Sequence, residues 1–184
     1  TIGSEPQDVF VLGNYAYTAG TGADELNIID VSNTTSLSMA GSISLGTLSW
    51  PKVVVKENYA YVVDHASDAL RVIDVGTPAS PSVVATLALG GEPNSIEVDG
   101  NYAYTVGFGS DELKIIDIST PTSPSITSSL TLGTAPRRLQ KSGSHVLVID
   151  NGIDDIKAIN VADPTSPYVV QSLSSGTYPW DIDI

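Results

Sequence analysis

The sequence predicts an all-β fold of four similar units, each with four antiparallel strands, because one pattern recurs along the chain at a nearly constant interval. Its first motif, Asn-Tyr-Ala-Tyr or a diverged Ser-His-Val-Leu, begins at residues 14, 58, 101 and 144, which are 44, 43 and 43 residues apart. A second motif, Leu-x-Ile-Ile-Asp or a close variant, begins at residues 26, 70, 113 and 156 and keeps that interval. An interval of roughly 40 to 50 residues is typical of a repeat architecture.

The first two strands of a unit can be recognised in the third repeat. After Pro93, the apolar residues Ile96 and Val98 alternate with acidic residues, which is the pattern of a half-buried strand. Gly100-Asn101 indicates a tight turn. Residues 102–106 form a run of aromatic and β-branched side chains, which favours a second strand.

The last two strands of this repeat follow a polar, glycine-containing loop at residues 107–111. Residues 113–118 are almost continuously apolar, as expected for a strand that is buried on both faces. The sequence Thr-Pro-Thr-Ser-Pro at residues 120–124 ends this strand, because proline lacks the N–H that a sheet requires. Spaced apolar residues between 126 and 132 then predict a more exposed fourth strand.

A repeat of this length with four strands is typical of the blade of a β-propeller. We therefore expect a single repeat domain over residues 1–184, in which each blade is stabilised by packing on its neighbours. The four repeats are expected at residues 5–48, 49–91, 92–134 and 135–177.

The inner-strand pattern occurs a fifth time, near the end of the sequence. A proline precedes the inner strand of each repeat, and these prolines are Pro6, Pro51, Pro93, Pro136 and Pro179. Residues 178–184 are therefore expected to be the inner strand of a fifth blade, so that the four blades belong to a larger ring or assembly. The expected partners are other copies of the chain or the rest of a longer chain, because a terminal blade exposes a sheet face and strand edges. We accordingly expect that the isolated chain is not a well-behaved monomer.

The motif Leu-x-Ile-Ile-Asp-Val-Ser, followed by a turn such as Thr-Pro-x-Ser-Pro, resembles the LVIVD repeat family. Its copies lie at residues 26–32, 70–76, 113–119 and 156–162, and the turns at residues 33–37, 77–81, 120–124 and 163–167. The resemblance covers essentially the whole chain, and it implies a propeller-like protein of bacterial or archaeal cell surfaces with no single chemistry. Two copies depart from the motif. The first turn lacks both prolines, and the fourth repeat has Asn160, His145 and Leu147 in place of the aspartate and the aromatic pair.

The composition disfavours two classes of partner. The chain has 21 acidic and 8 basic residues and a net charge of −13, and only Arg137 and Arg138 are adjacent cations. Nucleic acid is therefore a poor partner, because phosphate binding depends on clusters of lysine and arginine. No apolar run approaches the roughly 20 residues that span a bilayer, so no membrane insertion is expected. The abundance of Ser, Thr and Gly favours an extracellular or cell-surface protein.

Ligand-binding candidates come from two loops that a propeller places together, namely the loop before each inner strand and the loop after each second strand. These candidates are Trp50, Lys52, His65, Glu92, Arg137, Arg138, Tyr178 and Trp180. Aromatic residues with a polar fringe suit a sugar face or a protein partner. The alternative is that the tryptophans close the narrow end of the channel or pack on the next blade.

Two further kinds of site are suggested by recurring or short motifs. An aspartate recurs before each third strand, at Asp24, Asp68, Asp111 and Asp154, and carboxylates in loops could bind calcium. The alternative is a structural turn, in which aspartate binds its own main chain, and no other cofactor is expected. Asn33-Thr34-Thr35 fits the pattern of an N-glycosylation site in an exposed turn, or it is simply a polar turn.

The sequence favours a protein without enzymatic activity, because Asp30, Asp74 and Asp117 recur as structural residues and only two histidines are present. The expected function is that of an extracellular or surface β-propeller module with a structural, adhesive or self-assembling role, which binds a protein or a glycan. Two alternatives remain open. One is a carbohydrate-binding propeller that uses Trp50, Tyr178 and Trp180, and the other is an enzyme whose site at the channel mouth contains His65, Arg137 and Arg138.

Overall fold

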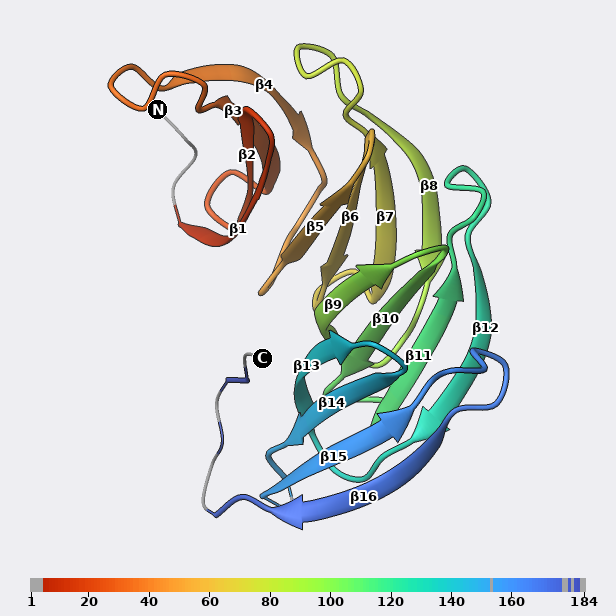
Figure 1. Ribbon diagram of the computed structural model, residues 1–184. Coiled ribbons are helices and arrows are strands. Elements are labelled where there is room, and N and C mark those ends of the chain that lie inside the picture. The colour runs from red at the N-terminus through yellow and green to blue at the C-terminus, as the bar shows by residue number, and fades with distance from the viewer. Residues whose placement is uncertain (1–4, 153, 177–178, 180, 183–184) are drawn as a thin grey trace. The chain divides into compact units, whose positions relative to one another are not determined.

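The computed structural model describes residues 5–152, 154–176, 179 and 181–182. Within these residues, sixteen strands form four separate four-stranded antiparallel sheets, and every sheet uses four consecutive strands in chain order (Figure 1). The predicted all-β fold of four-stranded antiparallel units is therefore confirmed. No helix of the described residues is long and apolar enough to cross a membrane.

The first and second sheets belong to one compact unit, residues 1–88, and the third and fourth belong to another, residues 89–184. The first sheet contains β1 (Pro6–Leu12), β2 (Tyr15–Gly20), β3 (Glu25–Asp30) and β4 (Ser38–Ser44). The second contains β5 (Lys52–Lys56), β6 (Tyr59–Asp64), β7 (Ala69–Asp74) and β8 (Ser82–Ala88). The third contains β9 (Pro93–Asp99), β10 (Tyr102–Gly107), β11 (Glu112–Asp117) and β12 (Ser125–Thr131). The fourth contains β13 (Pro136–Ser142), β14 (His145–Asp150), β15 (Asp155–Asn160) and β16 (Tyr168–Ser174). The expectation of a single domain over all four repeats stays a prediction.

The predicted inner strand of a fifth blade falls largely outside the described residues. Of residues 178–184, the structure describes Pro179, Asp181 and Ile182, and these three form no strand. Asp181 nevertheless lies against the fourth sheet, with a carboxylate oxygen 3.8 Å from Nε of Arg138 on β13.

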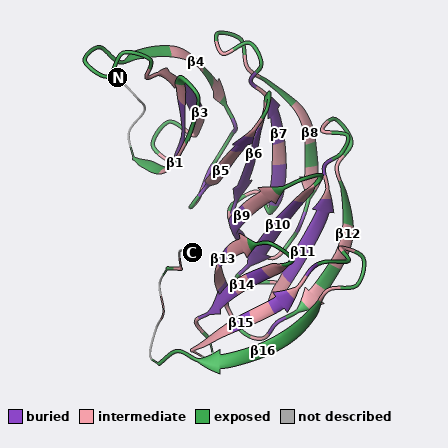
Figure 2. Ribbon diagram, viewed as in Figure 1, coloured by how far each residue is buried: buried purple, intermediate pink, exposed green. Residues whose placement is uncertain are grey.

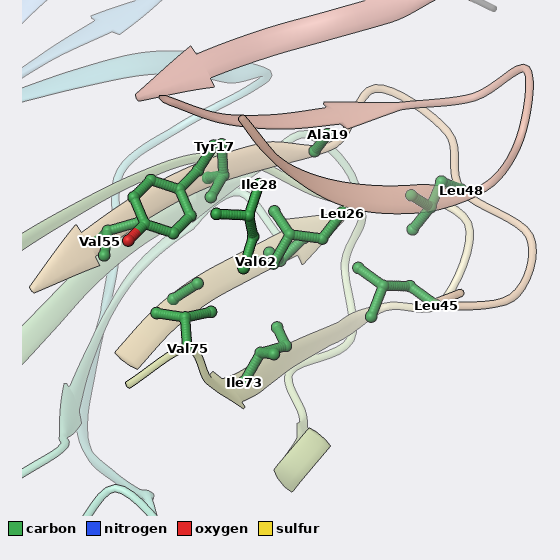
Figure 3. Packing of buried hydrophobic residues seen from close by; sticks show 12 residues of the cluster. Tyr17, Ala19, Leu26, Ile28, Leu45, Leu48, Val55, Val62, Ile73 and Val75 are labelled. Atoms are coloured by element: carbon green, nitrogen blue, oxygen red, sulfur yellow. The ribbon is translucent and has the colours of Figure 1, made fainter. Parts of the chain in front are cut away.

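The core of the first unit lies between its two sheets. The third-strand residues Leu26 and Ile28 are fully buried, as the continuous apolar pattern predicts. They belong to one cluster with Tyr17 of β2 and with Val53 and Val55 of β5, and Figure 3 shows Tyr17, Ile28 and Val55 close together in it. The inner strand of the second sheet therefore packs against the middle strands of the first.

The second unit repeats this packing with different residues. Leu139 of β13 lies in one cluster with Tyr104 of β10 and with Leu113 and Ile115 of β11. Leu139 stands opposite Val148 in its sheet, just as Val53 stands opposite Val62 in the second sheet. The repeated sequence thus produces the same interface between the sheets of each unit.

The acidic residue that ends each third strand caps the turn to the outer strand. Asp30 accepts a hydrogen bond from the amide of Ser32 (2.9 Å), and Asp117 accepts one from the amide of Ser119 (2.8 Å). Hydrogen bonds from these serines lower the pKa of both carboxyl groups. The predicted structural role of these aspartates is confirmed, and Asn160 makes the same contact in the fourth sheet, with the amide of Ala162.

Replacing Leu26 by alanine tests the packing between the first two sheets. Because Leu26 is fully buried in the cluster, Leu26→Ala is expected to lower the free energy of unfolding by about 3 kcal/mol. The measurement is chemical denaturation followed by circular dichroism. Leu37 is 60% exposed in a turn, so Leu37→Ala is the matched control, with an expected change within about 0.5 kcal/mol. Equal effects of the two substitutions would contradict this account of the core.

Candidate functional site

In every sheet, the loop that enters the inner strand is bonded to the loop between the second and third strands. We call this end of a sheet its loop edge. Main-chain hydrogen bonds of 2.9 to 3.2 Å join Thr21 N to Glu5 O, His65 N to Ser49 O, Phe108 N to Glu92 O and Asn151 N to Ala135 O. The sequence prediction that these two loops lie together is confirmed within each sheet.

The residue before the inner-strand proline has a left-handed backbone in all four sheets. The φ angles are 60° at Glu5, 48° at Trp50, 55° at Glu92 and 65° at Ala135. A left-handed conformation is unfavourable for residues with a Cβ atom, and a following proline disfavours helical backbone conformations as well. The hydrogen bonds between the two loops hold this strained conformation. The backbone is therefore constant at a position where the side chain varies, since two sheets have glutamate, one has tryptophan and one has alanine.

The second sheet presents an aromatic pair at its loop edge. The rings of Trp50 and His65 are 5.8 Å apart between centroids and are tilted by 48°. Trp50 is 56% exposed, so it does not pack as a core residue. Lys52, a predicted ligand residue at the start of β5, forms an ion pair of 3.3 Å with Asp8 of β1. The structure thus brings Trp50 and His65 together, whereas Lys52 stabilises the contact between two inner strands.

Asp64 binds the main chain next to both members of the aromatic pair. Its buried carboxylate accepts hydrogen bonds from the amides of Ser49 (3.3 Å) and Ala66 (2.9 Å), and from the side chains of Ser67 and Arg71 (2.7 Å from Nη1 of Arg71). Burial alone would raise the pKa of Asp64, but these hydrogen bonds lower it overall. A buried carboxylate with this many donors is a structural anchor that joins the two loops.

Two adjacent arginines lie at the loop edge of the fourth sheet. Arg138 donates from Nη1 to the main-chain oxygen of Asn94 on β9 (3.1 Å), and its Nε lies 3.8 Å from Asp181. Burial, together with the like charge of Arg138, lowers the pKa of Arg137. Two guanidinium groups are therefore crowded at one edge of a protein whose net charge is −13.

Two asparagines whose main chains contact this part of the unit have buried side-chain oxygens without partners. Among the described residues, Oδ1 of Asn94 and Oδ1 of Asn151 accept no hydrogen bond and are shielded from solvent. Asn94 contacts Arg138 through its main-chain oxygen, and the amide of Asn151 donates to Ala135, two residues before Arg137. A buried polar atom without a partner costs roughly 1 to 3 kcal/mol. The sequence places Asn94 in the loop that enters an inner strand but does not single it out as a ligand residue, and Asn151 before Gly152 has the pattern of an ordinary turn residue.

Glu97 is a second group that sequence reasoning missed. It lies on the inner strand β9 opposite Tyr104, and burial raises the pKa of its carboxyl group. Alignment of the strand pairs places Phe10, Val54 and Gln140 at the corresponding positions of the other inner strands. Two of the other three sheets have an apolar residue at this position. The carboxyl group of Glu97 departs from that pattern, and this difference could have identified Glu97 from the sequence.

The structure shows less about the remaining predicted ligand residues, Glu92, Tyr178 and Trp180. Glu92 lies at the loop edge of the third sheet, where its main-chain oxygen accepts the hydrogen bond from Phe108. Tyr178 and Trp180 lie outside the described residues.

The recurring aspartates lie in the turn before each third strand. Asp24 accepts a hydrogen bond from the amide of Leu48, and Asp111 accepts one from the amide of Ala135, both at 2.9 Å. All four, including Asp68 and Asp154, have left-handed backbone angles of 52° to 56°. In the part of the chain that the structure describes, no three His, Cys, Asp or Glu side chains gather as metal ligands. The two hydrogen bonds of Asp24 and Asp111 join the turn of one sheet to the loop that leads to the next sheet, and calcium binding at the four aspartates stays a prediction.

Asn33 lies in the exposed turn that was predicted for it. Its Oδ1 accepts hydrogen bonds from the amide (3.1 Å) and the hydroxyl (2.8 Å) of Thr35. Asp163 makes the same two contacts with Thr165 in the fourth sheet. The polar-turn interpretation therefore accounts for this geometry, and glycosylation at Asn33 stays a prediction.

Comparison with protein families identifies the repeat. The family model described as LVIVD repeat matches residues 3–44, 51–88 and 90–131. No curated protein matches the sequence.

Solved structures share the fold at low sequence identity. The periplasmic gluconolactonase PpgL of Pseudomonas aeruginosa is 17% identical with a TM-score of 0.81, and the match covers 96% of this chain and 55% of that one. A proposed 6-phosphogluconolactonase from Bacteroides uniformis ATCC 8492 is 13% identical with a TM-score of 0.80, covering 92% and 55%. Apo AztD from Citrobacter koseri is 14% identical with a TM-score of 0.70, covering 96% and 49%. The chain thus spans about half the length of these β-propeller-like proteins, and the similarity shows the fold alone.

The comparisons correct the predicted function. A structural, adhesive or self-assembling module was expected, but two of these three proteins of the same fold are named as lactonases. The expectation that the chain is not an enzyme stays a prediction. The prediction of such a module was wrong because it was drawn from the repeat motif. The motif residues form strands, caps and the core, and such residues specify an architecture without specifying its chemistry.

A titration of stability tests the environment of Glu97. A buried acid with a raised pKa destabilises the folded state when it ionises, so stability is lost as the pH rises through the folded-state pKa. Glu97→Gln is therefore expected to melt like the wild type below the ordinary glutamate pKa of about 4.3, and at a higher temperature near neutral pH. Thermal melts across this pH range measure the difference. Glu57→Gln, in an exposed turn, is the control, and a pH-independent difference for Glu97→Gln would contradict the assignment.

Proposed function

We propose that this chain, which belongs to the LVIVD repeat family, is part of a β-propeller that binds a small hydroxylated anion of the sugar-acid class. The proposed site is the loop edge of the third and fourth sheets. One observation carries the proposal, namely that buried side-chain oxygens without partners occur on Asn94, whose main-chain oxygen binds Arg138, and on Asn151, whose amide binds Ala135 beside Pro136 and Arg137.

The arginines supply the charge that such a ligand requires. Guanidinium groups bind carboxylates and phosphates through paired N–H donors, and these bonds are stronger than neutral ones. The lowered pKa of Arg137 shows that its charge is disfavoured by burial and by Arg138. A bound anion would relieve both effects, which favours binding at this position over a neutral ligand.

The asparagines supply hydrogen-bond acceptors for the ligand. An Oδ1 atom can only accept a hydrogen bond, so Asn94 and Asn151 call for donors. Ligand hydroxyl groups are such donors, and simple anions such as acetate lack them. The combination of cationic donors and neutral acceptors therefore fits a hydroxylated acid better than either a simple anion or a neutral sugar.

We further propose that the protein binds without chemical turnover and acts outside the cytoplasm. The second part is supported by the description of PpgL as periplasmic. A second candidate function is hydrolysis of the corresponding lactone, which the names of two similar solved structures favour. Neither function requires a metal or a cofactor.

Titration calorimetry with gluconate and 6-phosphogluconate tests the binding. Arg137→Ala is expected to weaken binding at least tenfold, which corresponds to about 1.4 kcal/mol. Lys52→Ala removes the same charge from an inner strand of the other unit and is expected to leave the affinity unchanged. Equal losses in the two variants, or no binding by the wild type, would refute the proposed site.

Replacing Asn94 by leucine separates a binding role from a structural one. Because Oδ1 of Asn94 is buried without a partner among the described residues, Asn94→Leu is expected to raise the free energy of unfolding by about 1 kcal/mol. The same substitution is expected to weaken gluconate binding and to leave acetate binding unchanged. Denaturation and calorimetry on one preparation measure both. A loss of stability would show that Asn94 serves the fold.

An assay of lactone hydrolysis measures the acid that is released from glucono-1,5-lactone and compares its rate with that of spontaneous hydrolysis. Acceleration that Arg137→Ala abolishes and Lys52→Ala retains would support the second candidate. A rate equal to the spontaneous one, with gluconate binding intact, would refute the second candidate alone.

A further inference from the structure

We propose that Asn33, in the turn between β3 and β4 of the first sheet, is an acceptor for an N-linked glycan. The proposal goes beyond ligand binding, and it concerns the compact unit that does not contain the proposed ligand site. Residues 33–35 form the only Asn-x-Ser/Thr sequence in the chain, and its middle residue is not proline. This is the acceptor pattern for glycosylation of an asparagine side chain.

The first turn departs from the other three turns at its first two residues. The second residue is Pro78, Pro121 or Pro164 in the other turns, whereas it is Thr34 in the first. A proline at this place would exclude the acceptor pattern. The first residue is asparagine only here, since the other turns have threonine, threonine and aspartate. Both departures from the repeat are needed to make the turn an acceptor, and they occur together.

The first turn nevertheless has the same backbone hydrogen bond as the others. The amide of Ser36 donates to the main-chain oxygen of Asn33 (2.9 Å), as Ser80 donates to Thr77 in the second sheet (2.8 Å). Oδ1 of Asn33 accepts hydrogen bonds from the amide (3.1 Å) and the hydroxyl (2.8 Å) of Thr35. These bonds hold the threonine hydroxyl that the acceptor pattern requires beside the carboxamide. They use only the oxygen of the carboxamide, so its nitrogen Nδ2 stays available for reaction.

The turn is accessible in the folded protein. Every residue from 33 to 37 is exposed, and Figure 2 shows the turn between β3 and β4 in green. Leu37, at the end of the turn, is 60% exposed. A glycan is bulky and polar, so it requires an attachment point from which it can extend into solvent. The turn at Asn33 meets this requirement without unfolding of the sheet.

Contact with a neighbouring sheet leaves this position of a turn open. In the second unit, the hydroxyl of Ser128 on β12 donates to the main-chain oxygen of Pro164 in the turn of the fourth sheet (2.6 Å). Asp163, which corresponds to Asn33, is exposed even so. A neighbouring outer strand therefore contacts the second residue of such a turn and leaves the first residue in solvent. The exposure of Asn33 does not depend on whether a sheet lies beside its turn.

The reaction transfers an oligosaccharide from a lipid pyrophosphate, which is the co-substrate of an oligosaccharyltransferase. Nδ2 of Asn33 attacks the anomeric carbon of the first sugar, and a carbon–nitrogen bond forms. The bond from that carbon to the pyrophosphate oxygen breaks, and the lipid pyrophosphate leaves with the electron pair. The proton that Nδ2 loses passes to a base of the transferase. No group is oxidised or reduced, and the turn keeps the amide oxygen that Thr35 binds.

Transfer to the folded protein by a purified oligosaccharyltransferase that accepts Asn-x-Ser/Thr tests the site. With a lipid pyrophosphate-linked oligosaccharide as donor, the wild type is expected to gain the mass of one glycan, which peptide mass spectrometry locates at Asn33. Asn33→Asp is expected to gain none. Because Asp163 makes the same two contacts with Thr165, this variant keeps the turn and removes only the acceptor nitrogen. Thr35→Val removes the required hydroxyl and is expected to abolish transfer.

Moving the acceptor pattern to the fourth sheet separates the sequence from the shape of the turn. Asp163→Asn alone places an asparagine in an exposed turn but before Pro164, so this variant is expected to carry one glycan, at Asn33. Asp163→Asn combined with Pro164→Thr reproduces the three residues of the first turn and is expected to carry two. Circular dichroism verifies that every variant folds.

Three results would overturn the proposal. The first is a wild type that gains no glycan while an Asn-x-Thr peptide is modified in the same reaction. The second is a glycan that persists in Asn33→Asp. The third is a double variant that gains no second glycan, because the exposed turn and the acceptor pattern would then not be sufficient together.

Discussion

The interaction on which this protein depends is the packing of one sheet's inner strand on the middle strands of the sheet before it. The third strands supply apolar residues such as Leu26 and Leu113, which are fully buried between the sheets of a unit. Burial of apolar surface contributes about 25 cal/mol per Å², and a single sheet cannot bury both of its faces alone. Stability therefore depends on a neighbour whose inner strand presents matching side chains, as Val53 and Leu139 do within their units.

This packing also determines where chemistry can occur. Neighbouring inner strands are held together by polar contacts as well, such as the bond from the amide of Val53 to Asp8 (2.9 Å) and that from the amide of Leu139 to Ser95 (3.2 Å). The loop edges are consequently rigid, and the strained residue before each proline is held in one conformation. A rigid scaffold with variable loop residues is a common arrangement for binding sites. Trp50 in one unit and Arg137 in the other occupy such positions.

Most of the fold could be predicted from the sequence, because strands, caps and turns depend on local pattern. Residues 102–106 were expected as a strand and form β10, and the capping role of Asp30 follows from its recurrence. The candidate site could be predicted only in part. The sequence places Arg137 on a loop edge, but the importance of Asn94 and Glu97 depends on which atoms the neighbouring sheet leaves without partners. The functional class could not be derived from motif residues, since those residues specify the architecture.

The buried polar groups of this protein are of two kinds, those with hydrogen-bond partners and those without. Only the second kind lowers the stability of the fold. Asp150 is fully buried at the end of β14, but Lys157 (3.0 Å) and the amide of Gly152 (3.1 Å) bind its carboxylate, as Arg71 and its neighbours bind Asp64. Such satisfied groups anchor loops. Asn94 and Asn151 are shielded in the same way, yet their oxygens have no partner in the described part of the chain. An apolar side chain would be more stable at such positions, and departures of this kind concentrate at functional sites. The unpaired amides therefore distinguish the proposed binding edge from the other loop edges.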